Sequence, residues 1–221
     1  MNKFFPVKRK RYVGFSRKER LFEIKRKIFH LFGILFPVCT YFFNQKTLLI
    51  ISILIYIPLI IIDYNKWFFI LRGNKKDSVD FFSFFSRKKE LKFGVLSGLP
   101  WIFLGYIVVI TFCEKNLVIV SMSILVVCDA MASLVGKNFG RTKIFNKSFE
   151  GSISFFVSGY FVICILSYYL PNFTLKTNLL LLSLVITTIT ELVSSKIKLD
   201  DNFSIPLSFC LAYNILLIIY E

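Results

Sequence analysis

Histidine and paired cysteines are scarce in this chain of 221 residues. His30 is the single histidine, and the five cysteines are scattered through apolar runs without a Cys-x-x-Cys pair. A zinc site draws its ligands from several His, Cys, Asp or Glu residues at characteristic spacings. The scarcity therefore argues against a zinc site, and the scattered cysteines exclude a small secreted module held together by disulfides.

The nucleotide-binding and catalytic motifs of soluble enzymes are also missing. The chain has no G-x-x-x-x-G-K-[ST] loop, no G-x-G-x-x-G loop and none of the protein-kinase elements. It likewise lacks the G-x-S-x-G and H-E-x-x-H motifs of hydrolases. Any chemistry must therefore be carried by a different arrangement of residues.

Acidic residues are few, and apolar residues are abundant. Lys and Arg number 28 against 13 Asp and Glu, while 56% of residues are hydrophobic and 19% are charged. Soluble domains are about 45–50% apolar and about 25% charged. Because the apolar residues come in long runs, the sequence excludes a soluble single-core enzyme or a disordered chain and predicts a polytopic membrane protein. We interpret the basic excess as a topology signal and expect no nucleic-acid partner.

Seven apolar runs predict an all-α bundle of about seven transmembrane helices. Residues 1–27 are expected to form a basic cytoplasmic juxtamembrane segment, followed by a single integral-membrane catalytic domain over 28–221. With the N-terminus in the cytoplasm, 25 of the 28 Lys and Arg residues fall on the cytoplasmic side, which places the C-terminus outside. The predicted spans are 28–43, 47–62, 95–113, 117–135, 152–170, 177–195 and 205–220.

Two acidic residues within predicted spans stand out as candidate functional groups. Asp129 lies toward the cytoplasmic half of the fourth span, and Glu191 lies near the cytoplasmic end of the sixth. An ionisable group in a membrane span is costly to bury and is a functional hypothesis by default. The predicted topology places both carboxylates on the same side as the strongly basic loops.

A stripe of small residues and a basic loop follow Asp129. Asp129, Ser133, Gly136 and Gly140 are spaced so that they share one helical face. The loop beyond them is rich in Lys and Arg and leads through Gly and Ser into a helix N-terminus, which suits a phosphate. Two alternatives stay open: Gly136 and Gly140 could form a helix-packing motif, and the loop could be basic only because it is cytoplasmic.

A late acidic cluster contains Asp200, Asp201 and Asn202. Their oxygens are the hard ligands that Mg²⁺ prefers together with substrate phosphates. We therefore expect Mg²⁺, or another divalent cation, to be held by Asp129, Asp200 and Asp201. The alternative is a solvated acidic loop.

A further cluster precedes the first span. Glu23, Arg26, Lys27 and His30 share one helical face at the membrane surface. The alternative interpretation is an ordinary basic helix attracted to anionic lipid.

Taken together, these clusters resemble the CTP-dependent lipid kinases, a family that includes dolichol, phytol and diacylglycerol kinases and is distantly related to phosphatidate cytidylyltransferases. The resemblance spans residues 23–206. Its early element matches Glu23, Arg26, Lys27, His30 and Gly33. Its central element matches Asp129, Ala132, Gly136, Phe139, Gly140, Lys147, Ser148, Glu150, Gly151 and Ser152, and its late element matches Glu191, Asp200, Asp201, Asn202, Ile205 and Pro206. One departure is Cys128, where the family usually has Gly.

The resemblance implies transfer of the γ-phosphate of CTP to the hydroxyl of a membrane lipid alcohol, such as a polyprenol, a phytol-like alcohol or diacylglycerol. Asp129 and either Glu191 or His30 are the expected catalytic residues. Nucleoside triphosphate, lipid alcohol and membrane lipids are the expected partners, and a bacterial cytoplasmic membrane is expected rather than the endoplasmic reticulum. The residues expected to bind the nucleotide are Gly136, Lys137, Gly140, Lys143, Lys147, Ser148, Glu150, Gly151 and Ser152.

Two other functions stay open at this point. One is transfer of CMP to a lipid phosphate by a cytidylyltransferase, although the late signature of those enzymes is missing here. The other is a non-catalytic transporter that uses Asp129 and Glu191 as an ion path.

Overall fold

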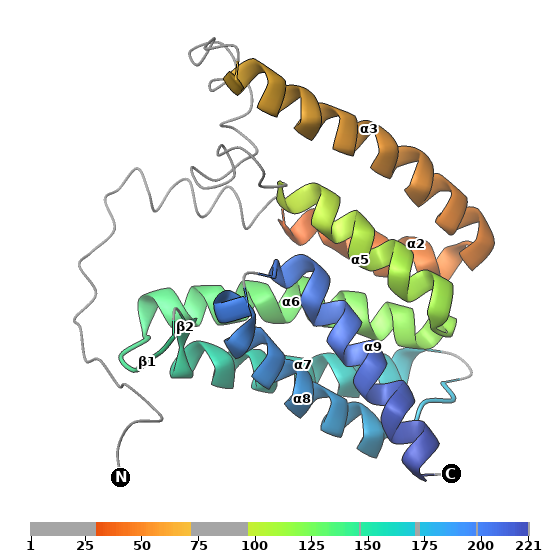
Figure 1. Ribbon diagram of the computed structural model, residues 1–221. Coiled ribbons are helices and arrows are strands. Elements are labelled where there is room, and N and C mark those ends of the chain that lie inside the picture. The colour runs from red at the N-terminus through yellow and green to blue at the C-terminus, as the bar shows by residue number, and fades with distance from the viewer. Residues whose placement is uncertain (1–29, 72–96, 146, 171–172, 198, 221) are drawn as a thin grey trace.

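The computed structural model describes residues 30–71, 97–145, 147–170, 173–197 and 199–220, and nearly all of them are helical (Figure 1). The predicted all-α class is confirmed, and a short antiparallel hairpin is added to it. The elements are η1 (Phe32–Ile34), α2 (Leu35–Phe42), α3 (Gln45–Leu71), α5 (Gly98–Phe112), α6 (Lys115–Asn138), β1 (Lys143–Ile144), β2 (Lys147–Ser148), α7 (Phe149–Tyr169), α8 (Thr177–Ile197) and α9 (Asp201–Tyr220).

Each predicted span coincides with a helical segment, and five of these helices are long and apolar enough to cross a membrane. The five stretches are Gln45–Asn65, Lys115–Asn138, Phe149–Tyr169, Thr177–Ser194 and Asp201–Tyr220. The other two apolar segments, Phe32–Phe42 and Gly98–Phe112, are shorter. At about 1.5 Å per residue, neither reaches across a hydrocarbon core of about 30 Å without help from its flanks. The count of seven crossings therefore stays a prediction.

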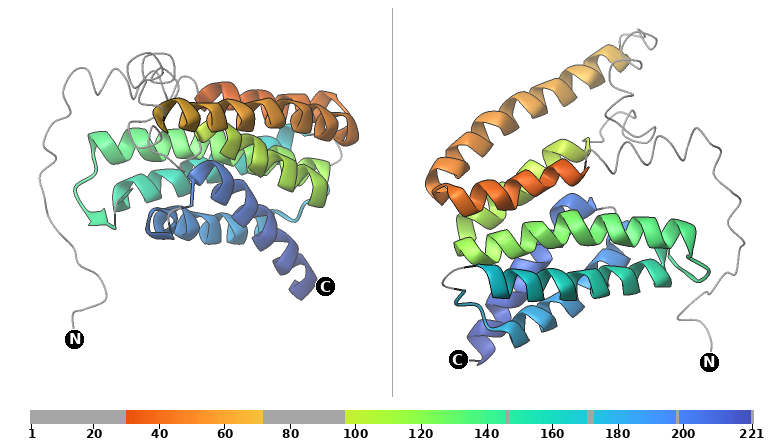
Figure 2. Two further views of the ribbon diagram at one scale, coloured as in Figure 1. Left: turned by 45° about the horizontal axis from the view of Figure 1, so that its top comes forward. Right: turned by 180° about the vertical axis from the view of Figure 1, so that it is seen from behind.

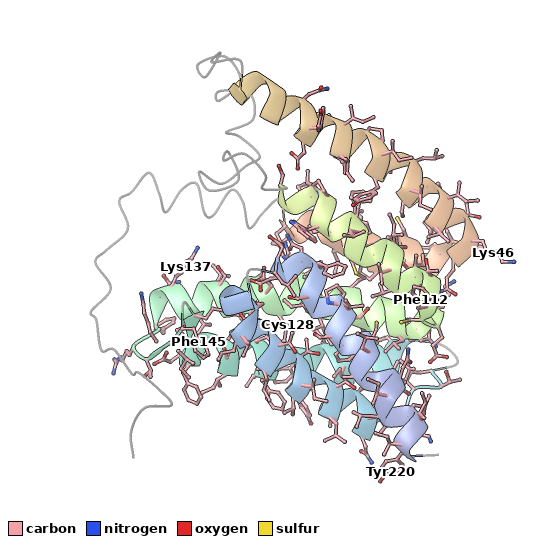
Figure 3. The ribbon with its side chains drawn as sticks, viewed as in Figure 1. Lys46, Phe112, Cys128, Lys137, Phe145 and Tyr220 are labelled. Carbon is pink, nitrogen blue, oxygen red and sulfur yellow. The ribbon has the colours of Figure 1, made fainter. Side chains whose placement is uncertain are left out.

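Several helix ends can be assigned to one end of the bundle or the other. Lys46, Phe112 and Tyr220 lie toward one end of the bundle, whereas Lys137 and Phe145 lie toward the other (Figure 3). The basic hairpin is thus opposite to the end of α9. Which end faces the cytoplasm stays a prediction.

Helix α6 forms the centre of the molecule. Two-thirds of its apolar window is buried (67%), and it contacts α7, α9, α2 and α5 (Figures 1 and 2). Its buried side chains form a continuous core with large side chains from the neighbouring helices, such as Tyr106, Phe155 and Phe209. Cys128 lies midway along α6 and is fully buried, and the side chain of the next residue, Asp129, is 16% exposed (Figure 3).

Helices α6 and α7 approach closely at the end that carries the hairpin. A Cβ atom on Gly136 would lie 2.6 Å from Ser148 Oγ, and one on Gly151 would lie 2.9 Å from the Ala132 carbonyl oxygen. A Cβ atom on Gly140 would collide with the Gly136 carbonyl oxygen and with Ser148. The glycine stripe therefore packs the two helices together, as the helix-packing alternative proposed.

Two helices extend beyond their predicted spans. Helix α3 continues to Leu71, well past the predicted end at residue 62, and α9 begins at Asp201 instead of residue 205. Asp200 caps α9, because its Oδ1 accepts a hydrogen bond from the Asn202 N–H at 3.0 Å and its carbonyl oxygen accepts one from the Ser204 N–H. Hydropathy marks the apolar part of a helix and misses a polar first turn that is stabilised by such a cap.

Asp63 joins α3 to α5. Its carboxylate is 4% exposed and accepts hydrogen bonds from the Ser97 N–H at 2.7 Å and the Ser97 hydroxyl at 2.6 Å. Ser97 is the residue immediately before α5. Asp63 lies one residue beyond the predicted end of the span, and the helix continues past it.

Replacing Gly136 by Ala is expected to destabilise the α6–α7 contact by about 1–3 kcal/mol, because the new methyl group must displace the Ser148 hydroxyl. Denaturant unfolding of the detergent-solubilised chain measures this change. Gly98→Ala is the control, since its Cβ would meet only the end of the Asn202 side chain, at 3.1 Å. Equal unfolding of Gly136→Ala and wild type would contradict the close packing.

Replacing Asp63 by Ala is expected to loosen the start of α5, because the Ser97 N–H and hydroxyl lose their shared acceptor. Amide hydrogen exchange in the first turn of α5 should accelerate about tenfold or more. Asp63→Asn retains one acceptor oxygen and should show a smaller change. Unaltered exchange in Asp63→Ala would show that Ser97 is held by other contacts.

Candidate active site

Lys147 is the centre of a charged network between three elements. Its Nζ atom lies 2.6 Å from Glu191 Oε1 on α8 and 3.0 Å from both carboxylate oxygens of Asp201 on α9. Lys147 itself belongs to β2. One ammonium group therefore holds the hairpin, α8 and α9 together.

Two serines complete the network. The Ser194 hydroxyl contacts Lys147 Nζ at 3.3 Å and donates to Asp201 Oδ1 at 2.5 Å. The Ser152 hydroxyl donates to Glu191 Oε2 at 3.3 Å. Both oxygens of Glu191 are thus engaged, one by the ammonium and one by Ser152.

The network is largely withdrawn from solvent. The Glu191 side chain is almost fully buried, and those of Lys147 and Asp201 are mostly covered. Burial lowers the pKa of Lys147, but the charges of Asp201 and Glu191 and their hydrogen bonds outweigh burial and hold that pKa above its ordinary value. Lys147 therefore stays protonated throughout the physiological pH range.

The hairpin that carries Lys147 is fixed by local structure. Its strands pair Lys143 with Ser148 and Ile144 with Lys147, and Phe145 in the turn has a positive φ of 57°. Such a φ is uncommon for a bulky residue and occurs in tight hairpin turns. This turn directs Lys147 back toward α8 and α9.

Local hydrogen bonds stabilise the start of α7. Ser148 caps this helix, with its hydroxyl accepting a hydrogen bond from the Gly151 N–H at 3.1 Å. The Glu150 carboxylate accepts one from the Thr142 N–H at 3.0 Å. Of the expected nucleotide-binding residues, Ser148, Glu150 and Gly151 therefore have structural contacts, and Gly136 and Gly140 pack against them. Lys137 and Lys143 lie at the same end of the bundle. Their role in nucleotide binding stays a prediction.

His30 and Asp129 meet although they are far apart in the sequence. His30 Nε2 lies 3.4 Å from Asp129 Oδ2 and 3.4 Å from the Leu125 carbonyl oxygen. The other members of the early cluster, Glu23, Arg26 and Lys27, lie outside the described residues.

The three residues of the late acidic cluster diverge. Asp200 caps α9, Asp201 joins Lys147, and the Asn202 side chain donates to the Gly98 carbonyl oxygen of α5 at 3.3 Å. Consecutive residues near the start of a helix point about 100° apart, which explains the divergence.

The expected metal ligands do not form a site in the described part of the chain. There, no three His, Cys, Asp or Glu side chains gather into a group that could hold a metal ion. Asp129, Asp200 and Asp201 therefore do not fit a preformed divalent-cation site. A bound metal ion stays a prediction.

Sequence reasoning missed Ser194. A signal was available, because Ser183, Thr187, Glu191 and Ser194 follow one another at helical spacing along α8, and all four are buried. Only Glu191 was recognised, because a serine in an apolar run is ordinary when it is considered alone.

The sequence was also compared with known proteins. A sequence model described as the cytidylyltransferase family matches residues 14–200. The chain belongs to this family. No solved structure matches it.

Several relatives are similar over different shares of their length. An uncharacterized protein of Rickettsia prowazekii is 36% identical over 199 residues, covering 88% of this chain and 94% of its own. Phytol kinase 1 of Arabidopsis thaliana is 34% identical over 109 residues, or 45% of this chain and 36% of its own. The CTP-dependent diacylglycerol kinase 1 of Eremothecium gossypii is 33% identical over 141 residues, or 54% and 44%. The match therefore spans less than half the length of either kinase.

Replacing Lys147 by Ala is expected to destabilise the protein by about 3 kcal/mol, because it leaves the buried Glu191 carboxylate without its cation. The double variant Lys147→Ala/Glu191→Gln should recover part of this loss by removing the stranded charge. Unfolding in detergent measures both. Arg141→Ala, at an exposed position in the same loop, is the control and should change stability by less than about 0.5 kcal/mol. Equal stability of the single and double variants would contradict the ion pair.

Proposed function

We propose that this membrane protein transfers the γ-phosphate of CTP to the hydroxyl group of a lipid alcohol at the cytoplasmic face of the membrane. A polyprenol, a phytol-like alcohol and diacylglycerol are the candidate acceptors. The proposal is supported by family membership and by the similarity to phytol and CTP-dependent diacylglycerol kinases.

The observation that carries the proposal is the contact between ionisable residues from separate sequence clusters. Lys147, Glu191 and Asp201 come from the central and late elements and are in direct contact. His30 and Asp129 come from the early and central elements and are also in contact. Packing alone does not require so many ionisable groups in a largely apolar bundle, since each is costly to bury.

The reaction would place the lipid at the edge of the bundle and the nucleotide over its polar end. The lipid hydroxyl oxygen forms a bond to the γ-phosphorus of CTP, the bond between that phosphorus and the β–γ bridging oxygen breaks, and CDP leaves. Such transfers depend mainly on positioning and on neutralising phosphate charge. Lys137, Lys143 and the neighbouring Arg141 supply positive charge at this end.

The arrangement favours His30 over Glu191 as the group that accepts the hydroxyl proton. Glu191 has one oxygen on Lys147 and the other on Ser152, and protonating it would weaken the ion pair. His30 lies beside Asp129, and a carboxylate in that position orients an imidazole ring and stabilises its protonated form.

Transfer of CMP to a lipid phosphate is the second candidate, and the family's own description favours it. The two reactions differ in which phosphorus of CTP reaches the lipid. The acceptor differs as well, since the second reaction needs a lipid that already carries a phosphate.

Label from the γ-phosphate of CTP is expected in the lipid fraction when membranes containing the full chain are supplied with Mg²⁺ and a lipid alcohol. Parallel reactions use CTP labelled at the α-phosphate, with phytol, polyprenols, diacylglycerol and phosphatidic acid as acceptors. Transfer of only the α label, with phosphatidic acid, would overturn the proposal in favour of the second candidate.

A carboxylate variant and its control test whether the site carries this reaction. Asp129→Asn should lower γ transfer by at least about a hundredfold while the protein remains folded, because the charge beside His30 is lost. Glu114→Gln removes an exposed carboxylate just before the opposite end of the same helix and should retain wild-type activity. Equal activity of the two variants would remove Asp129 from the mechanism.

A further inference from the structure

Ser204 has a buried hydroxyl group with no hydrogen-bond partner. The residue is 5% exposed, and in the described part of the chain its Oγ is the single buried side-chain nitrogen or oxygen without a partner. In a helix, a serine hydroxyl can donate a hydrogen bond to a carbonyl oxygen one turn back, as the Ser208 hydroxyl does to the Ile205 carbonyl oxygen at 3.0 Å. A buried polar group without this hydrogen bond requires an explanation. One explanation is that a bound ligand supplies the missing partner.

The hydroxyl lies one helical turn from the charged network. Ser204 follows Asp201 by three residues on α9, so the two side chains share a face of that helix. Asp201 contacts Lys147 from this face. If the end that carries the hairpin faces the cytoplasm, Ser204 lies one turn deeper in the membrane than the network.

The same face of α9 continues onto lipid-exposed apolar surface. Leu211 and Ile215 follow Ser204 by seven and eleven residues and are 51% and 55% exposed. A molecule lying along this face would have a polar end beside Ser204 and an apolar tail against Leu211 and Ile215. This is the shape and polarity of a lipid with a single polar head.

The hydrogen-bonding capacity of a serine hydroxyl suits an alcohol. An alcohol group can both donate a hydrogen bond to the Ser204 hydroxyl and accept one from it. Lys147, Glu191 and Asp201 already contact one another one turn away, so an uncharged lipid head leaves these contacts intact.

We propose that Ser204 is a substrate-positioning residue whose hydroxyl forms a hydrogen bond with the hydroxyl group of the lipid alcohol. The bond holds that oxygen one turn below Asp201, with the lipid tail along the exposed face of α9. This inference rests on the proposed function and adds where the alcohol binds.

Kinetics of the full chain in detergent micelles test the inference. In Ser204→Ala, the KM for phytol or diacylglycerol should rise about three- to tenfold, because one neutral hydrogen bond is lost, while the KM for CTP stays within twofold of wild type. Ser204→Thr retains a hydroxyl and should restore the alcohol KM. Ser208→Ala is the matched control on the same helix, since its hydroxyl is already satisfied by the backbone.

Thermal unfolding without nucleotide gives a second readout that does not require catalysis. Phytol should raise the melting temperature of wild type and of Ser208→Ala, and this shift should be lost in Ser204→Ala. Without phytol, Ser204→Ala should melt no lower than wild type, because it removes a hydroxyl that has no partner.

The outcomes separate this inference from the proposed function. If wild type transfers no γ label but phytol still stabilises wild type and not Ser204→Ala, the proposed function fails and the Ser204 contact stands. An unchanged alcohol KM and an unchanged phytol shift in Ser204→Ala would overturn the inference, leaving the hydroxyl to an ordered water. A Ser204→Ala protein that fails to fold or melts lower would also overturn it, because the hydroxyl would then be structural.

Discussion

The contact of one ammonium group with two carboxylates determines how the polar end of this membrane protein is organised. Lys147 is the shared partner of Glu191 and Asp201, and these three residues come from a hairpin and two helices that are separate in the sequence. A buried ion pair is not in itself a source of stability, since desolvation opposes it. Its effect is to select one packing arrangement. Both carboxylates need the same cation, and α8, α9 and the hairpin can bring all three groups together in one arrangement.

Close helix packing is what allows that contact. Lys147 comes at the end of a hairpin that follows directly from α6, and Gly136 and Gly140 let this end of α6 approach the start of α7. The Ser148 cap and the Glu150–Thr142 bond then keep the hairpin in place. The small residues therefore affect the site through the backbone, because they determine the position of the backbone that carries Lys147.

The sequence was sufficient for the apolar helices and for most of the ionisable groups that meet. Hydrophobic runs located the helices in the described part of the chain, and the polar clusters included Lys147, Ser152, Glu191 and Asp201. It was insufficient for residues whose role depends on three-dimensional partners. Asp200 and Asp201 look equivalent in the sequence, yet one caps a helix and the other pairs with lysine, because adjacent helical positions face different ways. Ser194 and Asp63 escaped notice because a single serine, or an acid near a helix end, carries no distinctive pattern.

The loosely packed helix α3 has a consequence for how the protein is assembled in its membrane. Only 17% of its apolar window is buried inside the protein, and its described contacts are with α5 and α2 (Figure 2). Lipid covers the apolar surface of α3 both before and after the helix packs against the bundle. The insertion of α3 into the membrane is therefore independent of the other helices. Docking then contributes two polar attachments to α5, Asp63 on Ser97 and the Gln45 side chain on the Cys113 carbonyl oxygen, to an already inserted helix. Biogenesis can therefore complete the α5–α9 bundle first and add α3 as a late, separable step.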